Sequence, residues 1–402
     1  MSHDHGPPPA SSRRTRRIVT AVLVPAALAT LVALILLWPG DVSTEPAAGG
    51  GQRALGTVTA VAEQACPADA GRQRCGSATV RVTKGPGTGT DQTVDLPQGP
   101  GTSDLHVGDG VVLLYFPEAV PGGQPYAVAD RQRSTPMIWL IVVAVGVILA
   151  FGRWRGVTSL AGLAVSFALL LLFVVPAILA GSPPLLIAVV GASAIMFAAL
   201  YLTHGINVHT SVAVAGTLAS LVLTGVLGAL FTSLMQLSGL GSDDSSALAV
   251  TRSSLDLRGL LLAGIVIGAL GVLDDVTVTQ AVTVAEMTPS ATSRWELYRS
   301  AIRVGRAHVA SAVNTIVLAY AGASLPLLLL ISASSAPISD LLTSEYLAQE
   351  ILRSAVGTIG LVASVPITTA LAALVAELRP AAELRPAGAA PELRPGRHAR
   401  RS

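Results

Sequence analysis

The chain has 402 residues, of which 51% are hydrophobic and only 12% carry a charge, and its mean hydropathy is +0.63. Soluble globular domains contain about 25% charged residues, so this composition excludes a soluble domain and indicates a membrane protein. The formal net charge of +2 and the aromatic content of 4% also argue against nucleic acid as a partner.

Residues 1–17 form a polar segment that contains three prolines and ends in a cluster of four arginines. This composition predicts a disordered cytoplasmic tail, with a weak metal site at His3 and His5 as the alternative. Residues 18–38 follow as a run of 21 residues without a charged side chain. The run is longer than the apolar core of a signal peptide, so it predicts an uncleaved transmembrane helix.

Residues 39–134 are rich in Gly, Pro, Thr and Asp and are predicted to form a small all-β module. The expected strands are 55–63, 78–83, 92–96, 111–116 and 126–129. A five-stranded barrel of the OB type fits this strand count, and a sandwich-like arrangement stays open. The only two cysteines, Cys66 and Cys75, predict a disulfide if the module is extracytoplasmic, and metal binding by two thiols is the weaker alternative.

Residues 135–376 are predicted to form a seven-helix transmembrane domain, because residues 156–242 contain no Asp, Glu, Lys or Arg. The expected spans are 136–152, 157–179, 184–203, 211–235, 259–276, 308–331 and 355–375. With the first helix they give a membrane all-α helical bundle of about eight spans, into which the β module is inserted. Residues 377–402 repeat E-L-R-P three times, which predicts a disordered tail.

The positions of the arginines predict the orientation of the spans, because basic loops resist translocation across the membrane. If the N-terminal arginine cluster is cytoplasmic, then Arg153, Arg155, Arg299 and the arginine-rich C-terminus also lie on the cytoplasmic side. Both termini are therefore expected in the cytoplasm, and the β module is expected outside, where a disulfide can form.

The span at 259–276 carries the most informative polar residues. Gly264, Gly268 and Gly271 follow one another at helical spacing, and Gly264-x-x-x-Gly268 is a helix-packing signature. The same stripe continues to Asp275 and, further on, to Glu286. We therefore expect Asp275 to be the carboxylate that faces the bundle and binds an ion or substrate, with a structural role near the membrane surface as the alternative. Asp274 lies about 100° away and is expected at an interface or in water.

Four further polar residues are weaker candidates for binding a substrate or ion. Glu286 continues the stripe of Asp275, and Asn314 lies within the span at 308–331, where an amide more often links helices. His204 and Asn207 belong to a polar junction between two spans, which is most simply a turn.

Enzymatic activity is not predicted. The chain contains a single lysine, Lys84, so neither a phosphate-binding loop nor a Schiff-base site can be built, and no H-E-x-x-H, G-x-S-x-G or paired C-x-x-C motif is present. No cofactor and no metal site are expected.

Several segments resemble a known family. They are Y-L-T-H-G-I-N at 201–207, G-A-L-G-V-L-D-D-V at 268–276, N-T-I-V-L-A-Y-A-G-A-S-L-P-L-L-L-L at 314–330 and E-I-L-R-S-A-V-G-T-I-G-L-V-A-S-V-P at 350–366. Through them, residues 53–369 resemble the YibE/F family of bacterial multipass membrane proteins. The resemblance implies a location in the bacterial cytoplasmic membrane and an acidic position at Asp275, whereas an apolar residue is usual at the position of Asp274.

Two functions are compatible with these features, since the resemblance implies no established activity. The first is a secondary permease for a small solute or ion that uses the intramembrane carboxylate. The alternative is a membrane anchor or signalling or assembly protein whose β module binds an extracytoplasmic protein or envelope component. The lipid bilayer is the one partner that both hypotheses require.

Overall fold

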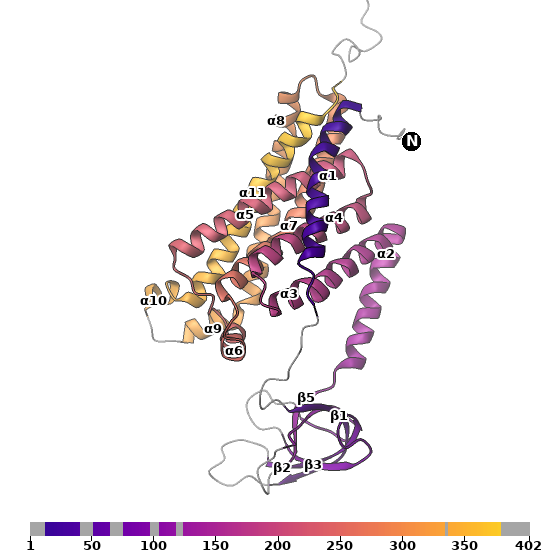
Figure 1. Cartoon of the computed structure of the whole chain (residues 1–402), viewed down its shortest axis with the longest axis vertical. Coiled ribbons are helices and arrows are strands. Elements are labelled where there is room, and N and C mark those ends of the chain that lie inside the picture. The colour runs from indigo at the N-terminus through magenta and orange to yellow at the C-terminus, as the bar shows by residue number, and fades with distance from the viewer. Residues whose placement is uncertain are drawn as a thin grey trace, which may run out of the picture. The chain divides into compact units, whose positions relative to one another are not determined.

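The computed structural model describes residues 13–40, 51–64, 75–96, 104–117, 124–333 and 337–378. The chain divides into two compact units, one of residues Ser43–Gly156 and one of Met1–Val42 together with Val157–Ser402 (Figure 1). The first unit contains a sheet and the first part of a long helix, and the second is entirely helical in its described residues.

The sheet contains five strands, in agreement with the prediction. They are β1 (Gln52–Gln64), β2 (Cys75–Lys84), β3 (Asp91–Asp95), β4 (Gly110–Tyr115) and β5 (Tyr126–Arg131). Their order is β3-β2-β1-β4-β5, and every neighbouring pair is antiparallel. The outer strands β3 and β5 also contact each other, so the sheet curves back on itself.

Alternating apolar side chains build the core of the β unit. Val58, Val80, Val111 and Leu113 are among those that are almost completely buried, while the residues between them on each strand are more exposed. The hydroxyl of Tyr126 on β5 donates to the carbonyl oxygen of Pro86 at 3.0 Å and so links β5 to the turn between β2 and β3. The one-sided burial is the expected consequence of the two-residue period of a strand.

The predicted disulfide concerns this unit. Cys75, the first residue of β2, is disulfide-bonded. Cys66 lies outside the described residues, so its pairing with Cys75 stays a prediction.

The helical segments overlap with all the predicted spans, although α1 ends at Leu36, before the predicted end at 38. They are α1 (Arg13–Leu36), α2 (Ser134–Leu169), the π-helical turn η1 (Leu170–Val174), α3 (Val175–Leu179), α4 (Pro184–His204), α5 (Val208–Leu234), α6 (Asp243–Thr251), α7 (Leu257–Met287), the 3₁₀ turn η2 (Thr288–Ser290), α8 (Arg294–Ala323), α9 (Leu325–Ala333), α10 (Ile338–Leu342) and α11 (Glu345–Val375).

The limits of two helices differ from the prediction. The first helix begins at Arg13, so the arginines expected in a disordered tail already belong to α1, and residues 1–12 lie outside the described residues. The span at 259–276 is part of the longer α7, which continues for eleven residues beyond 276 because Thr277 and Gln280 on its inner face are buried against other helices.

Within the described residues, six helices are long and apolar enough to cross a membrane, and a seventh span results if the bent pair α8 and α9, which meet at 66°, crosses as one. The predicted number of about eight spans is reached only if α2 and the segments after it are counted as two spans. Within α2, Arg153 has the non-helical φ of 49° and ψ of −127°. The residues of α2 before Arg153 are mostly exposed, and they belong to the same compact unit as the sheet.

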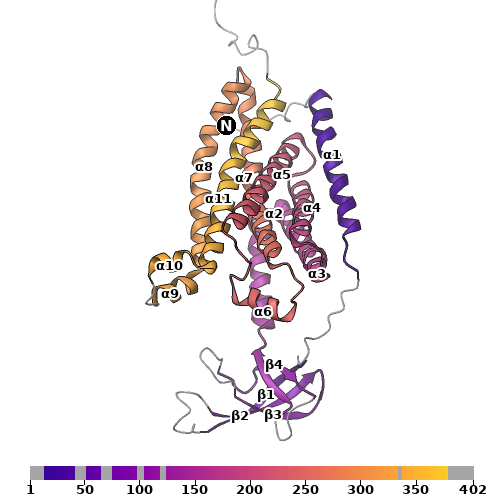
Figure 2. The same ribbon diagram turned by 60° about the vertical axis from the view of Figure 1, so that its left-hand side comes forward.

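The helical unit is built around α7, which contacts α4, α5, α8 and α11 (Figure 2). Its largest core cluster contains Ala192, Met196, Val266, Leu273 and Leu361 from α4, α7 and α11. The connection between α7 and α8 is short, so these two helices are antiparallel and contact each other.

Candidate functional site

The buried face of α7 is not the one that the glycine stripe predicts. Gly264, Gly268, Gly271, Asp275 and Glu286 are all exposed in the described structure. The opposite face carries Leu270, Leu273, Thr277, Gln280 and Val284, all buried among the neighbouring helices. The expectation that Asp275 points into the bundle is therefore wrong for a single copy of the chain, because the packed face of α7 carries these larger side chains rather than its glycine stripe.

Asp274 and Asp275 lie near the middle of α7. Asp274 is about 26 Å along the helix from Leu257 and about 20 Å from Met287, at 1.5 Å per residue. Asp274 is half-buried and Asp275 is exposed, which reverses the predicted assignment. In the part of the chain that the structure describes, neither carboxylate has a hydrogen-bond donor or an ion-pair partner.

A seam of buried polar side chains runs between α5, α7 and α11. The hydroxyls of Thr217 on α5 and Thr277 on α7 are hydrogen-bonded at 2.6 Å. The Gln280 amide donates to the hydroxyl of Thr369 on α11 at 2.7 Å and to the carbonyl oxygen of Ala301 on α8 at 3.1 Å. Gln280 therefore joins three helices with one side chain.

Glycines allow the helices of this seam to approach closely. A Cβ atom added to Gly216 on α5 would overlap with the hydroxyl of Thr368 on α11, and one added to Gly360 on α11 would overlap with the hydroxyl of Thr224 on α5. This seam is not among the features predicted from the sequence. Its sequence signal is the spacing of Thr217, Ser220 and Thr224, which places three hydroxyls on one helical face.

The remaining predicted residues do not gather around Asp274 and Asp275. Asn207 caps α5, because its side-chain oxygen accepts from the backbone of Thr210 at 2.7 Å, and its amide donates to the carbonyl oxygen of His204 at 2.9 Å. Asn207 and His204 thus form the predicted turn between α4 and α5. Asn314 is exposed on α8, and Glu286 is exposed near the C-terminal end of α7.

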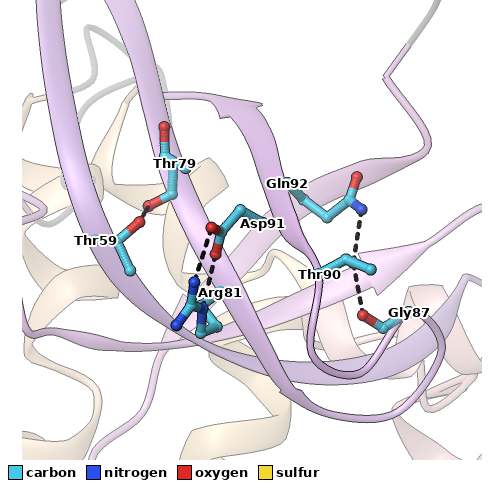
Figure 3. A network of polar contacts seen from close by, with 7 residues as sticks. All are labelled: Thr59, Thr79, Arg81, Gly87, Thr90, Asp91 and Gln92. Carbon is cyan, nitrogen blue, oxygen red and sulfur yellow. Dashed lines mark hydrogen bonds and ion pairs between the residues drawn. The ribbon is translucent and has the colours of Figure 1, made fainter.

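The β unit offers a second polar surface, over β1, β2 and β3 (Figure 3). Two guanidinium nitrogens of Arg81 donate to the two carboxylate oxygens of Asp91 at 2.9 and 3.0 Å. These hydrogen bonds lower the pKa of the Asp91 carboxyl, which is exposed to solvent. Thr90 and Gln92 are linked by a further hydrogen bond at 2.8 Å. The polar groups of this surface mostly bond to one another.

Within the described ranges, no group of three or more His, Cys, Asp or Glu residues is placed to hold a metal ion. Among the described residues, the α7 carboxylates with the adjoining seam form the first candidate site, and the β-sheet surface is a second one.

Comparison with known proteins gives one match, in the helical part of the chain. The family described as YibE/F-like protein matches residues 140–378, which include α4, α5, α7, α8 and α11 but leave out the sheet. No curated protein and no solved structure matches the chain.

Proposed function

This chain belongs to the YibE/F-like family, and from that premise we propose that it is a secondary permease in which carboxylates of α7 bind the transported or coupling cation. The multipass membrane character is established by six to seven membrane-length helices. The observation that supports transport is the pair Asp274 and Asp275 near the middle of a membrane-spanning helix. A carboxylate at such a depth is costly unless it binds a proton, a cation or water.

The two carboxylates differ in a way that suits this role. Asp274 is half-buried beside Leu270, which is packed in the main core, whereas Asp275 is exposed on the same turn. Two ionised carboxylates on adjacent residues repel each other, so a proton or metal cation bound to one of them relieves the repulsion. Of the two, the half-buried Asp274 is the better placed to hold that cation within the protein.

The proposal includes eight spans in the bacterial cytoplasmic membrane, with both termini in the cytoplasm. A single span of the 46 residues Ser134–Leu179 would be about 69 Å long, more than twice the hydrocarbon thickness of about 30 Å. The break at Arg153 divides this stretch into two segments of suitable length. The β unit then lies outside the cell.

We expect reporter fusions to show this topology. A periplasmic-active reporter placed after residue 96 and a cytoplasmic-active reporter placed after residue 378 should both be active, and exchanging the two reporters should abolish both signals. A C-terminus that is accessible from outside would contradict the eight-span arrangement, because an odd number of spans would then be required.

The transport proposal is tested with the purified full chain in liposomes on a solid-supported membrane, where jumps of pH, Na⁺ or K⁺ report cation movement as a current. We expect the wild type to give a current with at least one of these cations. Asp274→Asn and Asp275→Asn together should reduce it about tenfold or more, since the amides keep the size of the side chains but lose the charge. Asp274→Asn alone should have the larger effect because its carboxylate is the more buried.

Asp256→Asn is the matched control in the same helix. Asp256 caps α7 by accepting from the backbone of Gly259 at 2.8 Å, and asparagine caps a helix equally well. This variant should keep the wild-type current. The proposal would be contradicted if the wild type gave no current with H⁺, Na⁺ or K⁺, or if the double variant gave the same current as the wild type.

A second function, binding of an extracytoplasmic protein or envelope component, draws its support from the β unit. The order β3-β2-β1-β4-β5 with contact between β3 and β5 is the arrangement expected of a closed OB-type barrel, a fold that binds ligands on its strands and loops. We propose this barrel fold for the unit. The permease remains the preferred function because a carboxylate within a membrane-spanning helix is costly unless it has a role, whereas the polar groups of the sheet surface mostly bond to one another.

A further inference from the structure

The exposed face of α7 continues onto the neighbouring α8. On α7 it carries Asp275 and Glu286, and on α8 the exposed positions include Arg299, Arg303 and Arg306, which follow one another at helical spacing. We propose that these two faces form an interface with a second copy of the chain. The proposal does not depend on the permease function.

The two helices place opposite charges at the same depth. Gln280 on α7 bonds to the carbonyl oxygen of Ala301 on α8, and the helices are antiparallel. Asp275 lies five residues before Gln280 on α7, and Arg306 lies five residues after Ala301 on α8. Because the helices are antiparallel, these two steps go in the same direction, and Asp275 and Arg306 lie at the same height along the helix pair. In the same way Glu286 is level with the first two turns of α8, which carry Arg299.

The arginines border the open side of α7 rather than a distant surface of α8. Ile302 packs against the main core, and a Cβ atom added to Gly268 would lie 3.5 Å from the hydroxyl of Tyr320 on α8. Arg299, Arg306 and Tyr320 lie within about 60° of one another around the helix, at 100° per residue. The exposed stripe of α7 and the arginine row of α8 are therefore adjoining walls of one surface.

This surface is unsuited to contact with lipid. Asp275 lies on α7, which is long and apolar enough to cross a membrane, and within the described part of the chain neither Asp275 nor Arg306 forms an ion pair. Charged side chains that face hydrocarbon are rare because they lose their hydration without compensation. A protein partner that supplies the opposite charges removes this cost.

A second copy supplies those charges by symmetry. All copies have the same orientation in the membrane, so a two-fold axis runs along the membrane normal and brings residues of equal depth together. Asp275 of one copy can then meet Arg306 of the other, and the same contact repeats in the opposite sense. Gly264, Gly268 and Gly271 have no side chains on this face, which permits close helix contact across the interface.

Cross-linking of full-length chains in their native membrane tests the arrangement. We expect Asp275→Cys in one tagged copy and Arg306→Cys in a differently tagged copy to be joined by a short bismaleimide. Val222→Cys, at a 64% exposed position on α5, is the control partner and should give no product with Asp275→Cys. The wild type, whose native Cys75 is disulfide-bonded, should also give none.

Charge reversal provides an independent test by mass photometry of the protein in detergent. Asp275→Arg or Arg306→Asp alone should raise the monomer fraction about tenfold, because each places like charges opposite each other. The double variant Asp275→Arg with Arg306→Asp should restore the dimer. A wild type that is monomeric, with Asp275→Cys open to a water-soluble maleimide, would overturn the proposal, as would a double variant that stays as dissociated as the single ones.

Discussion

Replacing Gly216 by alanine is expected to destabilise the helical unit by about 1–3 kcal/mol, although alanine is the better helix former. The added methyl group would overlap with the Thr368 hydroxyl on α11, and it would also lie 3.1 Å from the Cβ and 3.3 Å from the Cγ2 of Thr368. Rotation of the threonine side chain cannot relieve all three contacts. The measurement is the thermal unfolding midpoint of the purified chain in detergent, followed by fluorescence-detected size exclusion.

The same substitution at Gly357 on α11 is the control. A Cβ atom there would meet no other atom within 4 Å, so Gly357→Ala should leave the unfolding midpoint unchanged or raise it through the gain in helix propensity of up to about 1 kcal/mol. The two substitutions are therefore expected to have opposite signs. If both lowered the midpoint equally, the close approach of α5 and α11 at Gly216 would not be the contact that holds the helical unit together.

Gln280→Glu is expected to have the larger effect on folding, about 3 kcal/mol or more and a strong loss of folded protein in the membrane. Gln280 is 3% exposed, and its amide nitrogen donates both hydrogen bonds that link α7 to α8 and α11. An ionised glutamate cannot donate either bond, and its charge would lie against the carbonyl oxygen of Ala301. The yield of monodisperse protein and the unfolding midpoint measure the loss.

Two variants separate the causes of that effect. Gln280→Met keeps the length of the side chain and removes only the hydrogen bonds, so it should cost about 1–2 kcal/mol. Thr279→Glu places the same charge one residue away on the exposed face of α7 and should leave the fold of the single copy intact. A Gln280→Glu protein as stable as the methionine variant would show that this position is hydrated rather than buried.

These two predictions concern the part of the molecule that sequence patterns describe least well. Long apolar runs identify membrane spans because the hydrocarbon core requires them, and alternation with turn residues identified the five strands. Both kinds of element are recognisable from neighbouring residues alone. The predicted span 259–276 is shorter than α7 because polar residues such as Thr277 and Gln280 are typical of the end of a membrane span. In the structure, these side chains form hydrogen bonds with neighbouring helices, and α7 continues.

The sequence by itself determined that α7 carries a stripe of glycines and carboxylates at helical spacing, because the period of a helix is a local property. Only the tertiary structure decided that this stripe is the open face, with Asp274 half-buried and Asp275 exposed. The physical reason is that lipid is as apolar as the bundle core, so hydrophobicity cannot tell one face of a membrane helix from the other. The distinction comes from which side chains fit against α4, α5, α8 and α11, and those neighbours lie far from α7 in the sequence.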